Sequence, residues 1–102
     1  MKEYGKLVRD RIPGIIRSKG EKCETHVAGD EEYRSLLALK LVEEAKEFAE
    51  EPGVDELADV LEVIEAIHAV YGIDPDKTGA ARLEKRGKRG GFEERIVLDR
   101  AD

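Results

Sequence analysis

Tryptophan, asparagine and glutamine are absent from this chain of 102 residues, and cysteine occurs once, at Cys23. A single cysteine excludes an internal disulfide and a zinc site built from cysteines. No stretch approaches the roughly 18 consecutive apolar residues of a membrane-spanning helix, and the first ten residues contain no apolar signal-peptide core. These absences predict a cytoplasmic protein with no membrane partner.

Basic residues are outnumbered by acidic ones, 18 to 24, which gives a formal net charge of −6. That balance argues against a dedicated nucleic-acid binder, which needs a basic surface to displace counterions. With 41% charged and 40% hydrophobic residues, the composition is that of a helical, folded chain. We expect one domain covering residues 1–102, with acidic residues concentrated in 30–65 and basic residues nearer the C-terminus.

The pattern of apolar residues predicts an all-α fold. Two helices, 31–51 and 54–71, are separated by Pro52-Gly53, and Asp74-Pro75 opens a further helix to about Arg86. The first pair is expected to be antiparallel. Dimerisation of two such pairs would give a four-helix bundle core.

Shorter elements are expected on either side of this pair. Asp10 is a candidate N-cap for a short helix that ends at Gly20, and Asp30 is a candidate N-cap for the helix that follows. A two-stranded β pairing of the 22–28 and 94–98 segments is a minor addition to the predicted fold.

Four acidic residues are placed symmetrically about the turn between the two long helices. Glu47 and Glu56 are equally far from this turn, and Glu44 and Asp59 lie one helical turn further away. In an antiparallel pair these carboxylates would face each other, and they would repel unless a hard divalent cation lay between them. The pattern therefore predicts a Mg²⁺ site formed by Glu44, Glu47, Glu56 and Asp59.

Helical periodicity places these acids on apolar faces rather than on solvent-facing ones. Glu56 and Asp59 begin a stripe that continues through Val60, Val63 and Ile67. Glu44 shares its face with Tyr33, Leu37, Leu41 and Phe48, whereas Glu43, Lys46 and Glu50 fall on the solvent side. Most acidic runs are simply part of a solvated surface. Lys40 is the one basic side chain on the same face as Glu44, and it is the alternative to a metal as the charge that neutralises Glu44.

These residues resemble the MazG-like superfamily of all-α nucleoside triphosphate pyrophosphohydrolases. The resemblance rests on Glu43-Glu44-Ala45-Lys46-Glu47 and Asp55-Glu56-Leu57-Ala58-Asp59-Val60-Leu61. The flanking segments 6–13 and 86–92 are similar to those of a small single-domain branch, often labelled phosphoribosyl-ATP pyrophosphohydrolase-like. Only residues 48–55 separate Glu47 from Glu56, a shorter connection than is usual in the superfamily, which leaves base recognition open.

The resemblance implies a hydrolase that cleaves a nucleoside triphosphate between its α- and β-phosphates, giving a monophosphate and pyrophosphate. It implies that the four acids above bind Mg²⁺, and that Glu43, the leading acid of the motif, orients the attacking water beside Glu44. It also implies a homodimer or higher homo-oligomer. The 54–71 helix supports this, since it is apolar on more of its surface than one neighbouring helix covers.

A triphosphate needs cations in addition to the metal, and arginine suits it because the guanidinium group donates two parallel hydrogen bonds. The candidates for phosphate binding are Lys85, Arg86, Lys88, Arg89 and Arg95, followed by Lys6, Arg9 and Arg11. A basic run at the end of a helix also has a purely structural explanation, because it interacts favourably with the helix dipole.

Two other functions remain open from the sequence. The same chemistry would act on phosphoribosyl-ATP in histidine biosynthesis if the pocket selected that substrate. Alternatively, the chain would be a non-catalytic helical module that binds a metal, a nucleotide or a protein partner. Release of pyrophosphate from defined substrates separates these alternatives.

Overall fold

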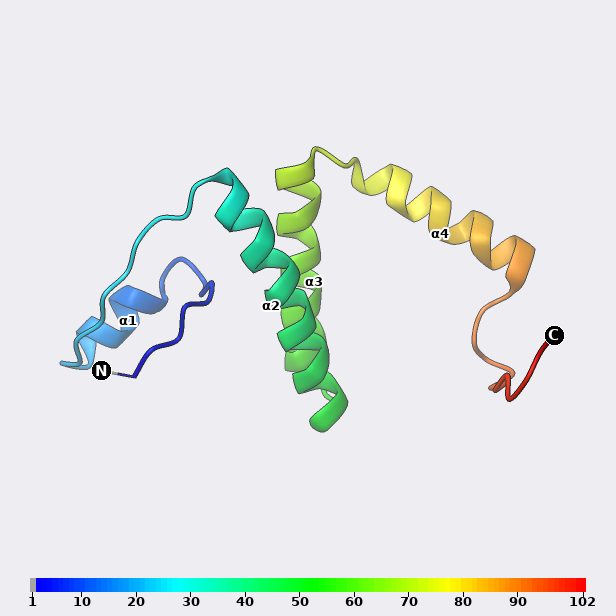
Figure 1. Ribbon diagram of the computed structural model, residues 1–102, viewed down its shortest axis with the longest axis horizontal. Coiled ribbons are helices and arrows are strands. Elements are labelled where there is room, and N and C mark those ends of the chain that lie inside the picture. Colours follow the sequence, from blue (N-terminus) through cyan, green and yellow to red (C-terminus); the bar gives the residue numbers. More distant parts are fainter. Residues whose placement is uncertain (1) are drawn as a thin grey trace. The chain divides into compact units, whose positions relative to one another are not determined.

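The computed structural model describes residues 2–102 as four helices joined by irregular segments (Figure 1). The helices are α1 (Ile12–Ser18), α2 (Asp30–Glu50), α3 (Val54–Tyr71) and α4 (Pro75–Arg89). No strand occurs among these described residues. The prediction of an all-α chain is therefore confirmed.

The contacts within the chain define two compact units. The first unit extends to Tyr71 and contains α1, α2 and α3, whereas the second, Gly72–Asp102, contains α4. In the first unit, α2 and α3 pack against each other and run antiparallel, with the turn at residues 51–53 joining them (Figure 1). This pair was the main structural prediction from the sequence.

The ends of α2 and α3 follow from local chemistry. Asp30, Glu31 and Glu32 occupy the first turn of α2, where negative charge is favoured by the helix dipole, and the helix stops just before Pro52. Helix α3 ends at Tyr71, and Gly72 has φ of +64°, the left-handed conformation that glycine adopts most readily after a helix. Both boundaries agree with the prediction to within one residue.

Two of the predicted helix caps are wrong. Arg11, not Asp10, immediately precedes α1, and Pro13 in the first turn has no N–H that requires a cap. Gly29 precedes α2, and Asp30 is already helical, so its charge acts through the helix dipole and not through a capping hydrogen bond. By contrast, Asp74 does cap α4, because its Oδ1 accepts a 2.9 Å hydrogen bond from the backbone N–H of Asp76.

The predicted β pairing of 22–28 with 94–98 is not shown, since each segment is irregular in the structure. A strand is stabilised by a hydrogen-bonded neighbour and by burial of its apolar side chains. Here Val27 is 98% exposed, and Ile96, Val97 and Leu98 are also exposed. Their alternation in the sequence is therefore not accompanied by burial in the isolated chain.

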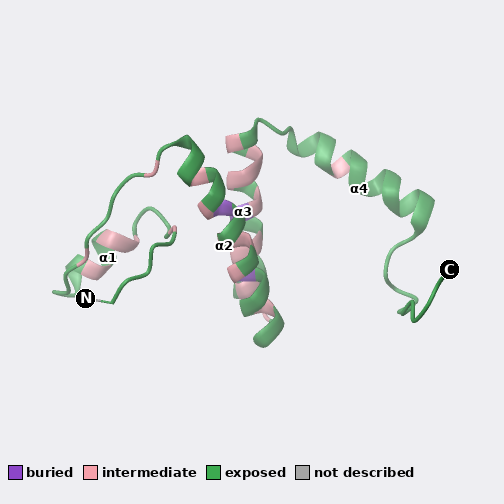
Figure 2. Cartoon of the chain, viewed as in Figure 1, coloured by how far each residue is buried: buried purple, intermediate pink, exposed green. Residues whose placement is uncertain are grey.

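The core between α2 and α3 is small. Among the described residues, the buried apolar side chains are Leu37 and Val63, and the buried charged residue is Glu44 (Figure 2). The predicted stripe of α3 does face α2, with Val63 buried and its neighbours Val60 and Ile67 half-buried. On the other apolar face of α3, Leu57 and Leu61 are exposed, whereas the ring of Tyr71 lies 5.7 Å from the guanidinium group of Arg34 on α2.

Within residues 2–102, each helix is either too short or too polar to cross a lipid bilayer.

Candidate metal site

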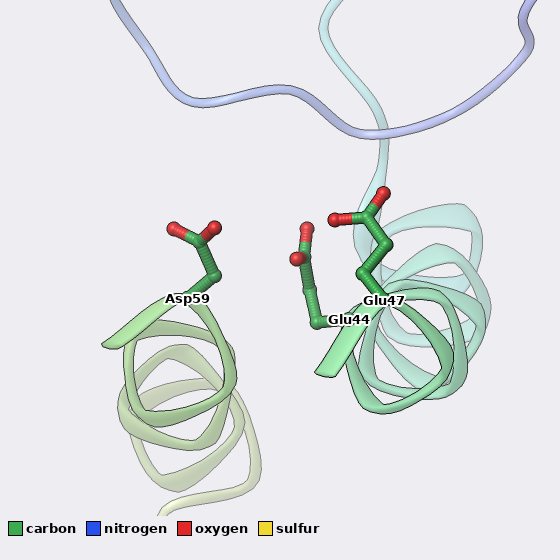
Figure 3. A group of neighbouring side chains, drawn as sticks. All are labelled: Glu44, Glu47 and Asp59. Atoms are coloured by element: carbon green, nitrogen blue, oxygen red, sulfur yellow. The ribbon is translucent and has the colours of Figure 1, made fainter. Parts of the chain in front are cut away.

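Three of the four predicted metal ligands lie together in the structure. Glu44 and Glu47 are one turn apart on α2, Asp59 is on α3, and each offers a carboxylate oxygen within 4.8 Å of the other two. Figure 3 shows the three side chains projecting from the same side of the helix pair, with Glu44 in the middle. We refer to Glu44, Glu47 and Asp59 as the acidic cluster.

Glu44 is the residue that makes this cluster unusual. It is only 6% exposed, and its Oε2 is buried with no hydrogen-bond partner in the part of the chain that the structure describes. Its Oε1 lies 3.4 Å from Nζ of Lys40, one turn earlier on the same helix. Burial, together with the nearby charge of Glu47, raises the pKa of Glu44. The prediction that Glu44 is buried, unlike an ordinary surface acid, is confirmed.

Glu56, the fourth predicted ligand, does not belong to the acidic cluster. Its carboxylate folds back toward the start of α3, so that a Cβ on Gly53 would lie 2.7 Å from Glu56 Oε1. Glu56 and Glu47 nevertheless line one hollow of about 350 Å³, together with Glu50 and Glu51. The structure thus places Glu56 beside the cluster, in a position where glycine at residue 53 makes room for it.

The solvent-side position predicted for Glu43 is wrong. This residue is half-buried, and Oε1 accepts a 2.6 Å hydrogen bond from Nζ of Lys6. Oε2 lies 3.4 Å from Nζ of Lys40. The Lys6 hydrogen bond, opposed by partial burial and assisted by the charge of Lys40, lowers the pKa of Glu43. Glu43 is therefore held ionised immediately beside the cluster.

A second basic residue of the N-terminal segment reaches α3. Arg9 Nη2 donates a 2.7 Å hydrogen bond to Oδ1 of Asp59. Lys6 and Arg9 were predicted only as phosphate-binding candidates, and their pairing with the carboxylates was missed. No local signal reveals it, because Lys6 and Glu43 are 37 positions apart and Arg9 and Asp59 are 50 apart.

The remaining basic candidates lie elsewhere in the chain. Arg11 is exposed and precedes α1. In the second unit, Arg86 donates a 2.6 Å hydrogen bond to Glu93 on the segment after α4, and Lys88 lies 2.9 Å from Glu84. Lys85, Lys88 and Arg89 line a hollow of about 200 Å³ on this helix, and Arg95 has φ of +61°.

The ligand chemistry of the acidic cluster fits a hard divalent cation. Carboxylate oxygens on rigid helices are the donors that Mg²⁺ prefers, usually with water and substrate oxygens completing the set. A buried carboxylate oxygen with no hydrogen-bond donor costs free energy, and a cation would remove that cost. A divalent cation bound here would satisfy the unpaired Oε2 of Glu44.

Comparison of this chain with protein-family models, with curated proteins and with solved structures found no match. The MazG-like resemblance is a hypothesis drawn from the two acidic motifs.

Proposed function

We propose that this protein is a Mg²⁺-dependent nucleoside triphosphate pyrophosphohydrolase of the MazG-like type. The observation that supports this function best is Glu44, a buried carboxylate whose Oε2 has no donor while Glu47 and Asp59 present oxygens nearby. A purely structural acid cluster would be expected to satisfy its most buried oxygen with a protein donor. A catalytic metal site leaves that position for the ion.

Each acid has a defined part in this proposal. Glu44, Glu47 and Asp59 hold the ion, and Glu56 reaches it through water or by rotating away from Gly53. When bound, Mg²⁺ supplies charge neutralisation for the phosphate oxygens and the leaving pyrophosphate. Glu43, kept ionised by Lys6, accepts a hydrogen bond from the attacking water and orients it toward the α- or β-phosphorus.

The proposal extends to a homodimer or higher homo-oligomer. Leu57 and Leu61 leave an apolar strip of α3 exposed, which a second copy of the chain would cover. Two helix pairs that joined through this face would form the four-helix bundle. The basic residues of the second unit, including Lys85 and Arg89, are retained as phosphate-binding candidates.

Pyrophosphate release tests this function directly. The purified protein is incubated with MgCl₂ and, separately, with each common ribo- and deoxyribonucleoside triphosphate and with phosphoribosyl-ATP. Turnover of triphosphates supports the proposal, and turnover of phosphoribosyl-ATP alone would select the histidine-pathway substrate instead. Absence of turnover with every substrate would leave a non-catalytic binding module. Glu62→Gln is a suitable control, since Glu62 is exposed on α3 outside the cluster.

A further inference from the structure

The N-terminal segment, residues 2–10, crosses the acidic cluster. In Figure 3 this segment, in the blue of the chain's beginning, passes over the side on which the three carboxylates project. Two ion pairs fix it there: Lys6 with Glu43 on α2 at 2.6 Å, and Arg9 with Asp59 on α3 at 2.7 Å. We call residues 2–10 the strap.

Lys6 and Arg9 make the two side-chain ion pairs between the strap and the α2–α3 pair that the structure shows among the described residues. The strap's residues form neither helix nor strand, and nearly all of them are exposed, with Leu7 half-buried. Each cation holds a different helix, so the two pairs connect the strap to both sides of the candidate metal site. The hydrogen bond to Glu43 raises the pKa of Lys6, and the charges of Glu43, Glu47 and Glu44 also raise it, against a lowering by partial burial. The strap thus brings permanent positive charge to the metal site.

The net charge of the side chains around the site bears on which ligand it would bind. Four carboxylates, from Glu43 and the acidic cluster, are accompanied by the cations Lys6, Arg9 and Lys40. These seven groups leave one negative charge and Glu56 beside them adds another, so a divalent cation would neutralise the site. A polyphosphate would then meet the cations Lys6 and Arg9 without net repulsion from the carboxylates. Arg9 also retains donors for such a ligand, because a guanidinium group has five N–H bonds and the bond to Asp59 uses one.

We propose that the strap is the phosphate-binding element of this site, with Lys6 and Arg9 donating hydrogen bonds to the phosphate oxygens of a metal-bound polyphosphate. This inference rests on the proposed metal site and adds to it. Arg9 binds phosphate through its remaining N–H groups while Nη2 stays paired with Asp59. Lys6 acts in the same way beside Glu43.

Inorganic pyrophosphate is the probe, since it contains the phosphate chemistry without a base or sugar. Metal affinity is first measured with Mn²⁺ by electron paramagnetic resonance, and pyrophosphate affinity is then measured by calorimetry at saturating Mg²⁺. We expect Lys6→Gln and Arg9→Gln each to weaken pyrophosphate binding by at least about 10-fold, the loss typical of a charged hydrogen bond. Mn²⁺ affinity should not fall. Lys19→Gln removes the same charge from the exposed end of α1, outside the strap, and should leave both affinities unchanged.

Tryptic cleavage gives a readout that is independent of activity. Trypsin cuts after Lys6 and Arg9, and Mg²⁺ with pyrophosphate should slow these cuts in the wild-type protein but not the cut at an exposed site such as Lys77. Arg9→Lys, which keeps the charge and is expected to keep the fold, should recover part of the pyrophosphate affinity lost in Arg9→Gln.

These measurements distinguish loss of the metal site from loss of phosphate binding by the strap. If the wild-type protein bound no Mn²⁺, or if Glu44→Gln bound it normally, the proposed metal site itself would be overturned. If Mn²⁺ bound through Glu44 but both Gln variants of the strap bound pyrophosphate as tightly as the wild type, the metal site would stand and the strap proposal would be wrong.

Discussion

Arg9 Nη2 lies 2.7 Å from Asp59 Oδ1, although 50 positions separate the two residues in the chain. This contact ties an irregular N-terminal segment to the helix that carries one of the three clustered acids. A carboxylate has two oxygens, so Asp59 can keep this bond and still offer Oδ2 to a cation. The candidate site therefore has three components, which are two helices and the segment that crosses them.

Replacing Glu44 with Gln should stabilise the metal-free protein and abolish its activity. The substitution removes a buried charge whose Oε2 has no donor, and we expect a gain on the order of 1 kcal/mol, or about 4 °C in Tm. Loss of a metal ligand should reduce turnover by at least about 100-fold. Thermal melts without metal and pyrophosphate-release assays measure the two effects. A variant that kept normal turnover would remove Glu44 from the metal site.

The stability of the metal-free protein should depend on pH through the same residue. Burial raises the pKa of Glu44 above its value in the unfolded chain, about 4.3, so the folded state retains a proton that the unfolded state has already lost. Stability contributed by this residue is thus present at low pH and is lost as pH rises from that value through the raised pKa.

Melting the wild type and Glu44→Gln side by side, from about pH 4 to pH 8 with a chelator, isolates this effect. The advantage of the variant in Tm should grow across the interval and then level off. Saturating Mg²⁺ should reverse the order of the two proteins at neutral pH, because the metal binds the ionised carboxylate. An advantage that stayed constant with pH would show that burial of a charge is not its cause.

Asp59 and Glu56 should differ in their importance for metal binding. Asp59 lies in the acidic cluster, whereas Glu56 is turned back over Gly53. We expect Asp59→Asn to weaken Mn²⁺ binding by at least about 100-fold and Glu56→Gln by less than about 10-fold. Equal losses in the two variants would indicate that Glu56 rotates into the cluster as a full ligand. Glu62→Gln, an exposed acid on the same helix, should have no effect on Mn²⁺ affinity.

Most of the helical framework, and all three residues of the acidic cluster, could be predicted from the sequence. Helix positions follow from local signals such as Pro52-Gly53 and Gly72, and the inward direction of Glu44 follows from its spacing relative to Leu37 and Phe48. Such signals act over a few residues. They are sufficient to place one residue on the correct face of a helix.

The features that sequence reasoning missed depend on distant contacts or on the path of a side chain. Glu43 was predicted to face solvent, but it is half-buried and paired with Lys6, which is distant in the sequence. Glu56 lies on the predicted stripe, yet its flexible side chain bends toward Gly53 and away from the cluster. Backbone periodicity fixes where a Cβ points, but three further rotatable bonds decide where a glutamate carboxylate ends.

The exposed apolar face of α3 provides the last prediction, which concerns assembly. Leu61 is 60% exposed and lies on the face opposite the small α2–α3 core, next to Leu57. If a second copy covers this face, Leu61→Glu places a charge in an apolar interface and should weaken dimerisation by at least about 2 kcal/mol. Light scattering after size-exclusion chromatography, at several protein concentrations, would show the shift from dimer to monomer. Leu83→Glu, an equally exposed leucine on α4, is the matched control and should leave the mass unchanged. A wild-type protein that remained monomeric at micromolar concentration would contradict the dimer, whatever the two variants did.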